Sequence, residues 1–157
     1  MNITPLILIV DDRPENLFLL RAILKNVNCD VIEASSEEIA LELANKMLFS
    51  CILLDVQMPN MNGFTLAKKL NAIQVFDQGP ILFITASDRC DEKIIEGYRC
   101  GAIDYLFKPF VPEILISKVN ILLELYTHKK NAEHALLTQE KMSLELKQLA
   151  YYDPLTE

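Results

Sequence analysis

Short runs of apolar residues alternate along the chain with longer stretches in which apolar residues recur every three or four positions. The runs cover residues 6–10, 30–34, 51–54, 81–85 and 104–107. Several of them are apolar at successive positions, which is typical of strands that helices cover on both faces of a parallel sheet. Five successive strand–helix units predict an α/β fold with a doubly wound, five-stranded parallel sheet.

The stretches between these runs predict four helices. Proline is favoured in the first turn of a helix, so the first helix should begin at Pro14. Ser35 and Glu38 have the spacing of a capping box for the second helix, which should end near Leu48. The third and fourth helices are expected at residues 62–73 and 91–100.

A fifth helix is expected to be much longer. From Pro112 onward the sequence has no proline or glycine until Pro154, and a row of positions along it alternates in spacing between four and three, as in a coiled-coil heptad. We therefore expect a globular domain at 1–126, a coiled-coil linker helix at 127–152, and the start of an output domain at 153–157. The alternative is a solvated or frayed helix that packs on something outside this sequence. The seam consists of Ile121, Leu125, His128, Ala132, Ala135, Gln139, Met142, Leu146 and Leu149.

Composition and charge narrow the function classes. The net charge of -7 disfavours nucleic-acid binding, because a phosphate backbone requires a clustered basic face. The apolar runs are far shorter than the roughly 20 residues of a membrane helix, and the N-terminus lacks the basic and apolar segments of a signal peptide. The 4 cysteines lack metal-binding spacing and are expected to be reduced structural thiols. We expect a cytoplasmic protein that binds neither nucleic acid nor a membrane.

Residues whose side chains could bind a ligand or take part in catalysis lie at or directly after the ends of the predicted strands. Asp11 and Asp12 follow the first strand, Asp55 follows the third, Thr85 ends the fourth, and Lys108 follows the fifth. Ligands of such sheets bind at the carboxyl ends of the strands. Carboxylates that converge there repel one another unless a cation lies among them, and Mg²⁺ prefers such oxygen ligands. Each residue alone also fits a helix cap, a turn or the surface, but five at one edge favour a functional site.

The chain from about Thr4 to Tyr126 resembles the receiver domain of two-component response regulators, in the stretches ILIVDDRPENLFLL, CILLDVQMPNMNGF, ILFITAS and AIDYLFKPF. The resemblance implies a CheY-like, flavodoxin-like sheet with strand order 2-1-3-4-5. It also implies that Asp55 accepts a phosphoryl group in a Mg²⁺-dependent reaction. Its implied metal ligands are Asp11, Asp12, Asp55 and the backbone carbonyl of Gln57, and its implied phosphoryl-binding side chains are Thr85 and Lys108.

The same resemblance implies partners and a switch. A sensor histidine kinase or a phosphotransfer protein would supply the phosphoryl group. Tyr105 stands at the family's switch-aromatic position and would turn inward as Thr85 moves toward the phosphoryl group; the alternative is a fixed, half-buried strand tyrosine. A homodimer would form through the face of the fourth helix, fifth strand and fifth helix, and through the coiled coil.

The last residues resemble the entry to a diguanylate cyclase (GGDEF) domain. Asp153, Leu155 and Thr156 match its opening, whereas Glu157 stands where glycine is usual. The sequence is therefore interpreted as part of a longer protein that makes cyclic di-GMP. The alternative is a receiver that signals by docking to another protein, without a cyclase.

Two other classes fit the first strand less well. A haloacid-dehalogenase-like phosphatase also combines aspartate with Mg²⁺, but it needs D-x-D where this sequence has Asp11-Asp12-Arg13. A flavodoxin needs a Ser/Thr/Gly-rich phosphate loop after the first strand, and that loop is acidic here.

Overall fold

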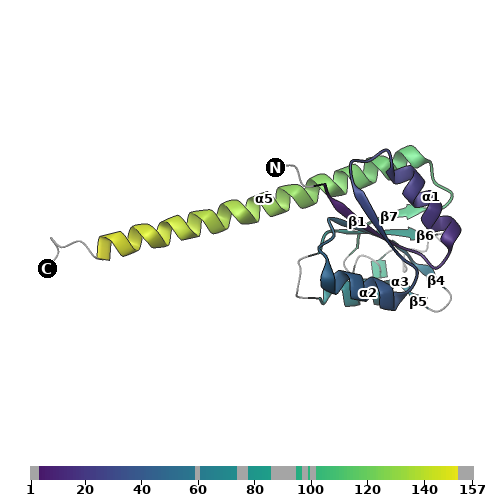
Figure 1. Cartoon of the computed structure of the whole chain (residues 1–157), viewed down its shortest axis with the longest axis horizontal. Helices are drawn as coiled ribbons and strands as arrows, with labels where there is room; N and C mark the ends of the chain where they lie inside the picture. The colour runs from purple at the N-terminus through teal and green to yellow at the C-terminus, as the bar shows by residue number, and fades with distance from the viewer. Residues whose placement is uncertain are drawn as a thin grey trace. The chain divides into compact units, whose positions relative to one another are not determined.

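A five-stranded parallel sheet forms the centre of the globular unit Met1–Tyr126 (Figure 1). The computed structural model describes residues 4–58, 61–73, 78–85, 95, 96, 99 and 102–151. The strands lie in the order β2-β1-β3-β6-β7. This is the predicted order 2-1-3-4-5, because β4 and β5 form a separate small sheet, so the fold prediction is confirmed. The sheet strands are β1 (Leu6–Val10), β2 (Asp30–Ala34), β3 (Cys51–Asp55), β6 (Ile81–Thr85) and β7 (Ala102–Phe107).

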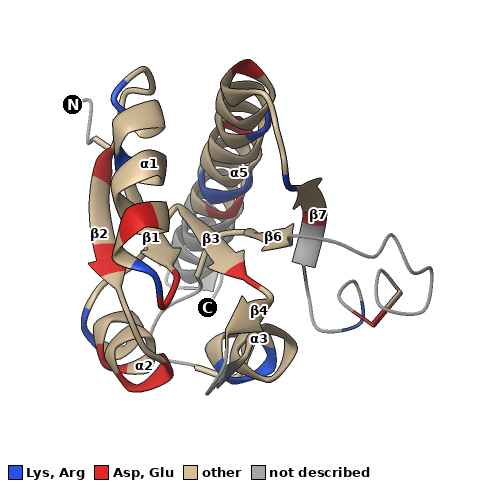
Figure 2. Ribbon diagram, turned by 90° about the vertical axis from the view of Figure 1, so that its right-hand side faces the viewer, with Lys and Arg blue, Asp and Glu red and all other residues tan. Residues whose placement is uncertain are grey.

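Helices cover both faces of this sheet, as the uninterrupted apolar runs predict. Alternate residues of a strand point to opposite faces, and Leu8 of β1 packs into one core while its neighbour Ile9 packs into the other. Figure 2 shows α1 and the start of α5 on one side of the sheet and α2 and α3 on the other. The helices are α1 (Pro14–Leu24), α2 (Glu37–Lys46), α3 (Gly63–Asn71) and α5 (Pro112–Tyr151).

The chain divides into two units, Met1–Tyr126 and Thr127–Glu157, and α5 contributes to both. The helix expected at 91–100 falls mostly outside the described residues, and the segment at 153–157, which resembles the entry to a cyclase domain, lies wholly outside them. Within the part of the chain that is described, no helix is both long and apolar enough to cross a membrane.

The start of α2 differs from the prediction by one residue. Ser36, not Ser35, is the N-cap, and its hydroxyl accepts a hydrogen bond from the amide of Ile39 at 3.2 Å. Ile39 therefore occupies the third helical position, so the capping box predicted for Ser35 and Glu38 is wrong. A serine pair before an acidic turn leaves the sequence pattern ambiguous by one position.

The end of α2 is fixed by a side chain from a distant loop. The Gln78 amide donates hydrogen bonds to the carbonyls of Ala44 and Met47, both at 2.9 Å, and its oxygen accepts one from the amide of Phe49 at 2.7 Å. Helix ends leave such backbone groups without internal partners. This explains why α2 ends at Lys46 rather than near Leu48.

A second small sheet lies directly after β3. Strands β4 (Gln57–Met58) and β5 (Met61–Asn62) pair antiparallel and were not predicted. The Asn62 side chain then caps α3 by accepting a hydrogen bond from the amide of Phe64 at 2.9 Å. This small sheet thus lies between the carboxyl end of β3 and the start of α3 in the chain.

Candidate functional site

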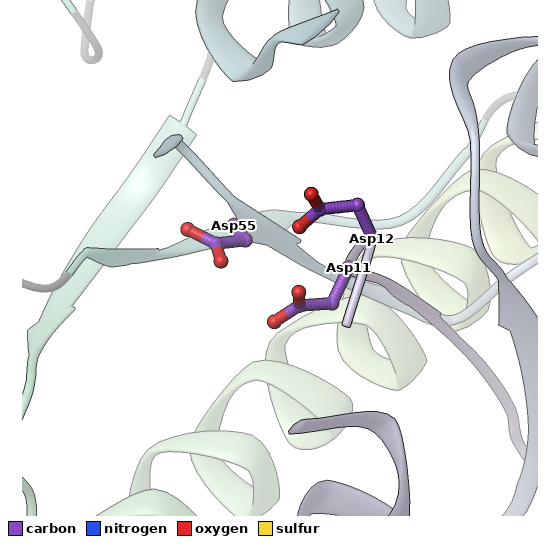
Figure 3. A group of neighbouring side chains, drawn as sticks. All are labelled: Asp11, Asp12 and Asp55. Atoms are coloured by element: carbon purple, nitrogen blue, oxygen red, sulfur yellow. The ribbon is translucent and has the colours of Figure 1, made fainter. Parts of the chain in front are cut away.

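Three carboxylates meet at the carboxyl edge of the sheet. Asp11 and Asp12 follow β1, and Asp55 ends the adjacent strand β3. One carboxylate oxygen from each lies within 4.8 Å of the others. Asp11 is 2% exposed and Asp55 6%, whereas Asp12 is half-buried. Figure 3 shows the three side chains lying side by side.

Burial makes this cluster unfavourable without a cation. Loss of hydration raises the pKa of the Asp11 carboxyl above its ordinary value of 3.8, and the neighbouring Asp55 charge raises it further. Hydrogen bonds from the Arg13 amide, at 3.0 Å, and from the Asn16 side chain, together with the Lys108 charge, act in the opposite direction. Because burial is the largest of these effects, the net result is a raised pKa, and the ionised form of Asp11 is unfavourable in the folded chain.

Lys108, directly after β7, supplies positive charge. Its Nζ atom lies 3.6 Å from Oδ2 of Asp55 and 4.0 Å from Oδ2 of Asp11. The Lys108 amide also donates a hydrogen bond of 2.7 Å to the carbonyl of Thr85. The backbone therefore holds Lys108 at the end of β6, where the Thr85 side chain is buried.

Asp55 is held in place by the backbone that follows it. Its Oδ1 atom accepts a hydrogen bond from the Gln57 amide at 3.0 Å. Sequence reasoning missed Gly63, which closes this turn: a Cβ atom there would lie 2.6 Å from the Asp55 carbonyl oxygen and 2.7 Å from Cα of Val56. Only glycine allows so close an approach. The dipeptide Asn62-Gly63 is typical of turns, but this pattern alone does not indicate that Gly63 packs against Asp55.

The structure therefore brings the predicted site residues to one edge. Asp11, Asp12, Asp55 and Lys108 form one cluster, and Thr85 ends the strand beside Asp55. These carboxylates fit Mg²⁺, because Mg²⁺ prefers a few hard oxygen ligands together with water. The Asp12 side chain is partly exposed, so solvent reaches this edge of the sheet. Binding of the metal, and a role in it for the Gln57 carbonyl, stay predictions.

Comparisons with known proteins show the family of this chain. A family model of the response regulator receiver domain matches residues 7–120. Transcriptional regulatory protein SrrA of Staphylococcus aureus is 38% identical over 117 residues, which make up 74% of this chain and 47% of SrrA. This chain thus spans about half the length of the curated relatives it matches.

Solved structures match the same region. The chemotaxis protein CheY4 of Vibrio cholerae is 31% identical, with a TM-score of 0.70 over 76% of this chain and 99% of that one. The receiver domain of Francisella response regulator 1452 is also 31% identical, with a TM-score of 0.68 over 77% of this chain and 98% of that one.

The sheet order and the residues at its carboxyl edge define a CheY-like signalling domain. The chain belongs to the response regulator receiver domain family of two-component systems. Receiver domains typically receive phosphoryl groups from histidine kinases.

Asp11→Asn should stabilise the protein at neutral pH when Mg²⁺ is chelated. The raised pKa means that ionised Asp11 costs folding free energy, and this cost appears as the pH rises above the ordinary value of 3.8 and through the raised pKa. Asparagine keeps an oxygen for the Arg13 amide but carries no charge. Stability of the wild type in chelator should therefore fall with rising pH, and that of Asp11→Asn should fall less.

Urea unfolding between pH 4 and pH 8 measures this difference. Glu15→Gln is the control, because Glu15 is an exposed carboxylate in the first turn of α1. Added Mg²⁺ should stabilise the wild type more than Asp11→Asn. Equal pH profiles for the two proteins would show that the cluster is not under electrostatic strain.

Proposed function

We propose that this receiver domain transfers a phosphoryl group from a phosphohistidine or a small phosphodonor to Asp55. The observation that carries the proposal is the triad of carboxylates within 4.8 Å together with Lys108 Nζ at 3.6 Å from Asp55. An acceptor must present an ionised oxygen to phosphorus, and the Lys108 ammonium places positive charge beside that carboxylate.

The transfer step can be written from these residues. A carboxylate oxygen of Asp55 forms the new P–O bond, while the bond from phosphorus to the donor breaks and its electron pair leaves with the donor. The product is an acyl phosphate on Asp55. Charge spreads over the peripheral phosphoryl oxygens in such a transition state, so placement and cationic stabilisation dominate catalysis.

The residues around Asp55 would bind the metal ion and the phosphoryl oxygens. Asp11, Asp12, Asp55 and the Gln57 carbonyl would hold Mg²⁺, which when bound supplies positive charge to the phosphoryl oxygens. The Lys108 ammonium neutralises a further oxygen, and the Thr85 hydroxyl donates a hydrogen bond to another. Through Thr85, the change at Asp55 would reach Tyr105 in the neighbouring strand.

The test is incubation of the chain with acetyl phosphate in the presence of Mg²⁺ or of EDTA, followed by intact mass measurement. One phosphoryl group should be added with Mg²⁺ and none with EDTA. Equal labelling in both samples would contradict the metal-dependent step.

We further propose that phosphorylation acts on a dimer with paired diguanylate cyclase outputs. The cyclase-like residues Asp153, Leu155 and Thr156 support it, as does the seam along α5. In the first unit the seam residues Ile121 and Leu125 are 54% and 50% exposed, so this unit leaves them unburied. SrrA is named a transcriptional regulatory protein. The cyclase output proposed for this chain therefore rests on its own sequence and not on this relative. Docking without a cyclase is the alternative, and the codons after Glu157 distinguish the two.

Sedimentation tests the dimer. The chain should associate more strongly with beryllofluoride and Mg²⁺, and Ile121→Glu on the seam should weaken association by about tenfold or more, because burying a charge in an apolar interface is costly. Glu124→Ala, an exposed position off the seam, should change little. A chain that stays monomeric at high concentration in both states would rule out the coiled coil.

The remaining expectations concern partners and location. The expected lack of nucleic-acid binding applies to these 157 residues alone, and it stays a prediction, as does the cytoplasmic location. A histidine kinase or phosphotransfer protein is the proposed partner of this chain.

A further inference from the structure

Two structural requirements meet at Asn62 and Gly63, where the small sheet leads into α3. Asn62 is the N-cap of α3, and its Oδ1 atom accepts a hydrogen bond of 2.9 Å from the amide of Phe64. Gly63 must lack a side chain, because a Cβ atom there would lie 2.6 Å from the carbonyl oxygen of Asp55. The fold therefore needs a capping residue directly before a glycine.

An asparagine followed by a glycine has a reactivity that neither requirement explains. The backbone nitrogen of the residue after an asparagine can attack the carbon of the side-chain amide. Glycine leaves that nitrogen unhindered because it has no side chain. Asn62 is exposed, so water and base reach its amide. No other glycine of the chain follows an asparagine, so this reactivity is concentrated at one position.

The folded backbone holds the reacting atoms in an arrangement that prevents the attack. The product is a five-membered ring, which requires Cβ of the asparagine and the following nitrogen to eclipse across the Cα–C bond. For an L residue this needs a strongly negative ψ, whereas Asn62 has ψ 116°. The attacking nitrogen is also engaged, since the Gly63 amide donates a hydrogen bond of 3.3 Å to the carbonyl of Val56. Ring closure therefore requires that this hydrogen bond and the Asn62 cap open first.

We propose that Asn62-Gly63 is a site of spontaneous deamidation that the folded domain keeps closed. After local opening, the Gly63 nitrogen gives its proton to solvent base and bonds to Cγ of Asn62. The Cγ–Nδ2 bond breaks, and the side-chain nitrogen takes up a proton and leaves as ammonia. Water then adds to one of the two ring carbonyls and breaks its bond to nitrogen, which gives aspartate or isoaspartate. Water is the only co-reactant.

The two products differ in their effect on the neighbouring strand. Aspartate retains a side-chain oxygen for the Phe64 amide and caps helices as well as asparagine does. Isoaspartate instead adds its Cβ carbon to the main chain, which lengthens the path to Gly63. Because Gly63 packs against the backbone of Asp55, the added carbon disturbs the support of the acceptor. The resulting loss of phosphoryl uptake rests on the proposed function, whereas the deamidation itself does not.

The site is tested by incubating the chain in mildly alkaline buffer with and without urea. Peptide mapping then measures isoaspartate, and fragmentation assigns it to residue 62. Conversion should be about tenfold or more slower in the folded chain, because two hydrogen bonds must open before the ring can close. Asn71 is the internal control in urea: it precedes alanine, so it should convert more slowly than Asn62. Equal rates at Asn62 in folded and unfolded protein, or conversion in urea no faster than at Asn71, would overturn the inference.

Asn62→Asp separates the effect of charge from that of the added carbon. The freshly purified variant should take up a phosphoryl group from acetyl phosphate and Mg²⁺ to the same extent as wild type. Deamidated wild type, refolded and separated by its added charge, should lose uptake in proportion to its isoaspartate content. Full uptake by the isoaspartate form would contradict the effect on Asp55. Fresh wild type without uptake would contradict the proposed function, while the rates in the mapping experiment would still decide the deamidation site.

Discussion

Gly79→Ala is expected to lower the free energy of unfolding by about 3 kcal/mol, the upper end of the usual cost of overpacking. A Cβ atom at Gly79 would overlap the carbonyl group of Ser50 and would lie 2.9 Å from the carbonyl oxygen of Phe49. The Gly79 amide also donates a hydrogen bond of 2.8 Å to that Phe49 oxygen. Because the obstacles are backbone atoms, the loop cannot relax without losing this bond.

Urea unfolding of wild type and variant measures the loss. The double variant Gly79→Ala/Ser50→Ala is the control, since trimming the Ser50 side chain leaves its carbonyl in place and should not rescue stability. The loss should not alter the carboxylate cluster, because Gly79 precedes β6 at the opposite edge of the sheet. A change below about 0.5 kcal/mol, the range of ordinary surface substitutions, would mean that the loop from Gln78 to Gly79 adapts freely.

The strands follow from the sequence because the sheet is buried on both faces, whereas their order was implied by the resemblance to receiver domains. Runs such as Leu6–Val10 and Ile81–Thr85 are apolar at every or nearly every position, and the observed bounds coincide with the predicted ones. Helix ends are harder to predict. Ser35 and Ser36 offer the same cap chemistry one residue apart, and the Gln78 contacts that end α2 join residues about 30 positions apart in sequence.

The residues of the candidate site also include some that the sequence predicts and one that it does not. Asp11, Asp12, Asp55 and Lys108 could be predicted together, because parallel strands bring their carboxyl ends to one edge. Gly63 could not, since its role depends on how closely its backbone approaches the backbone of Asp55 and Val56 in the folded chain.

Asp55→Asn is expected to abolish phosphoryl uptake while the fold persists. Asparagine has nearly the same shape and retains an oxygen to accept the hydrogen bond from the Gln57 amide. It also removes one of the charges that raise the pKa of Asp11, so the variant should be at least as stable as wild type in chelator. It lacks the ionised oxygen that must bond to phosphorus.

Intact mass of wild type, Asp55→Asn and Asp104→Asn after incubation with acetyl phosphate and Mg²⁺ therefore tests the central claim most directly. Asp104 is the control because it lies on β7 and pairs with Lys118, at 2.5 Å, rather than with the carboxylate cluster. Wild type and Asp104→Asn should each gain the mass of one phosphoryl group, and Asp55→Asn should gain none. A mass gain that persists in Asp55→Asn would place the acceptor elsewhere and contradict the account.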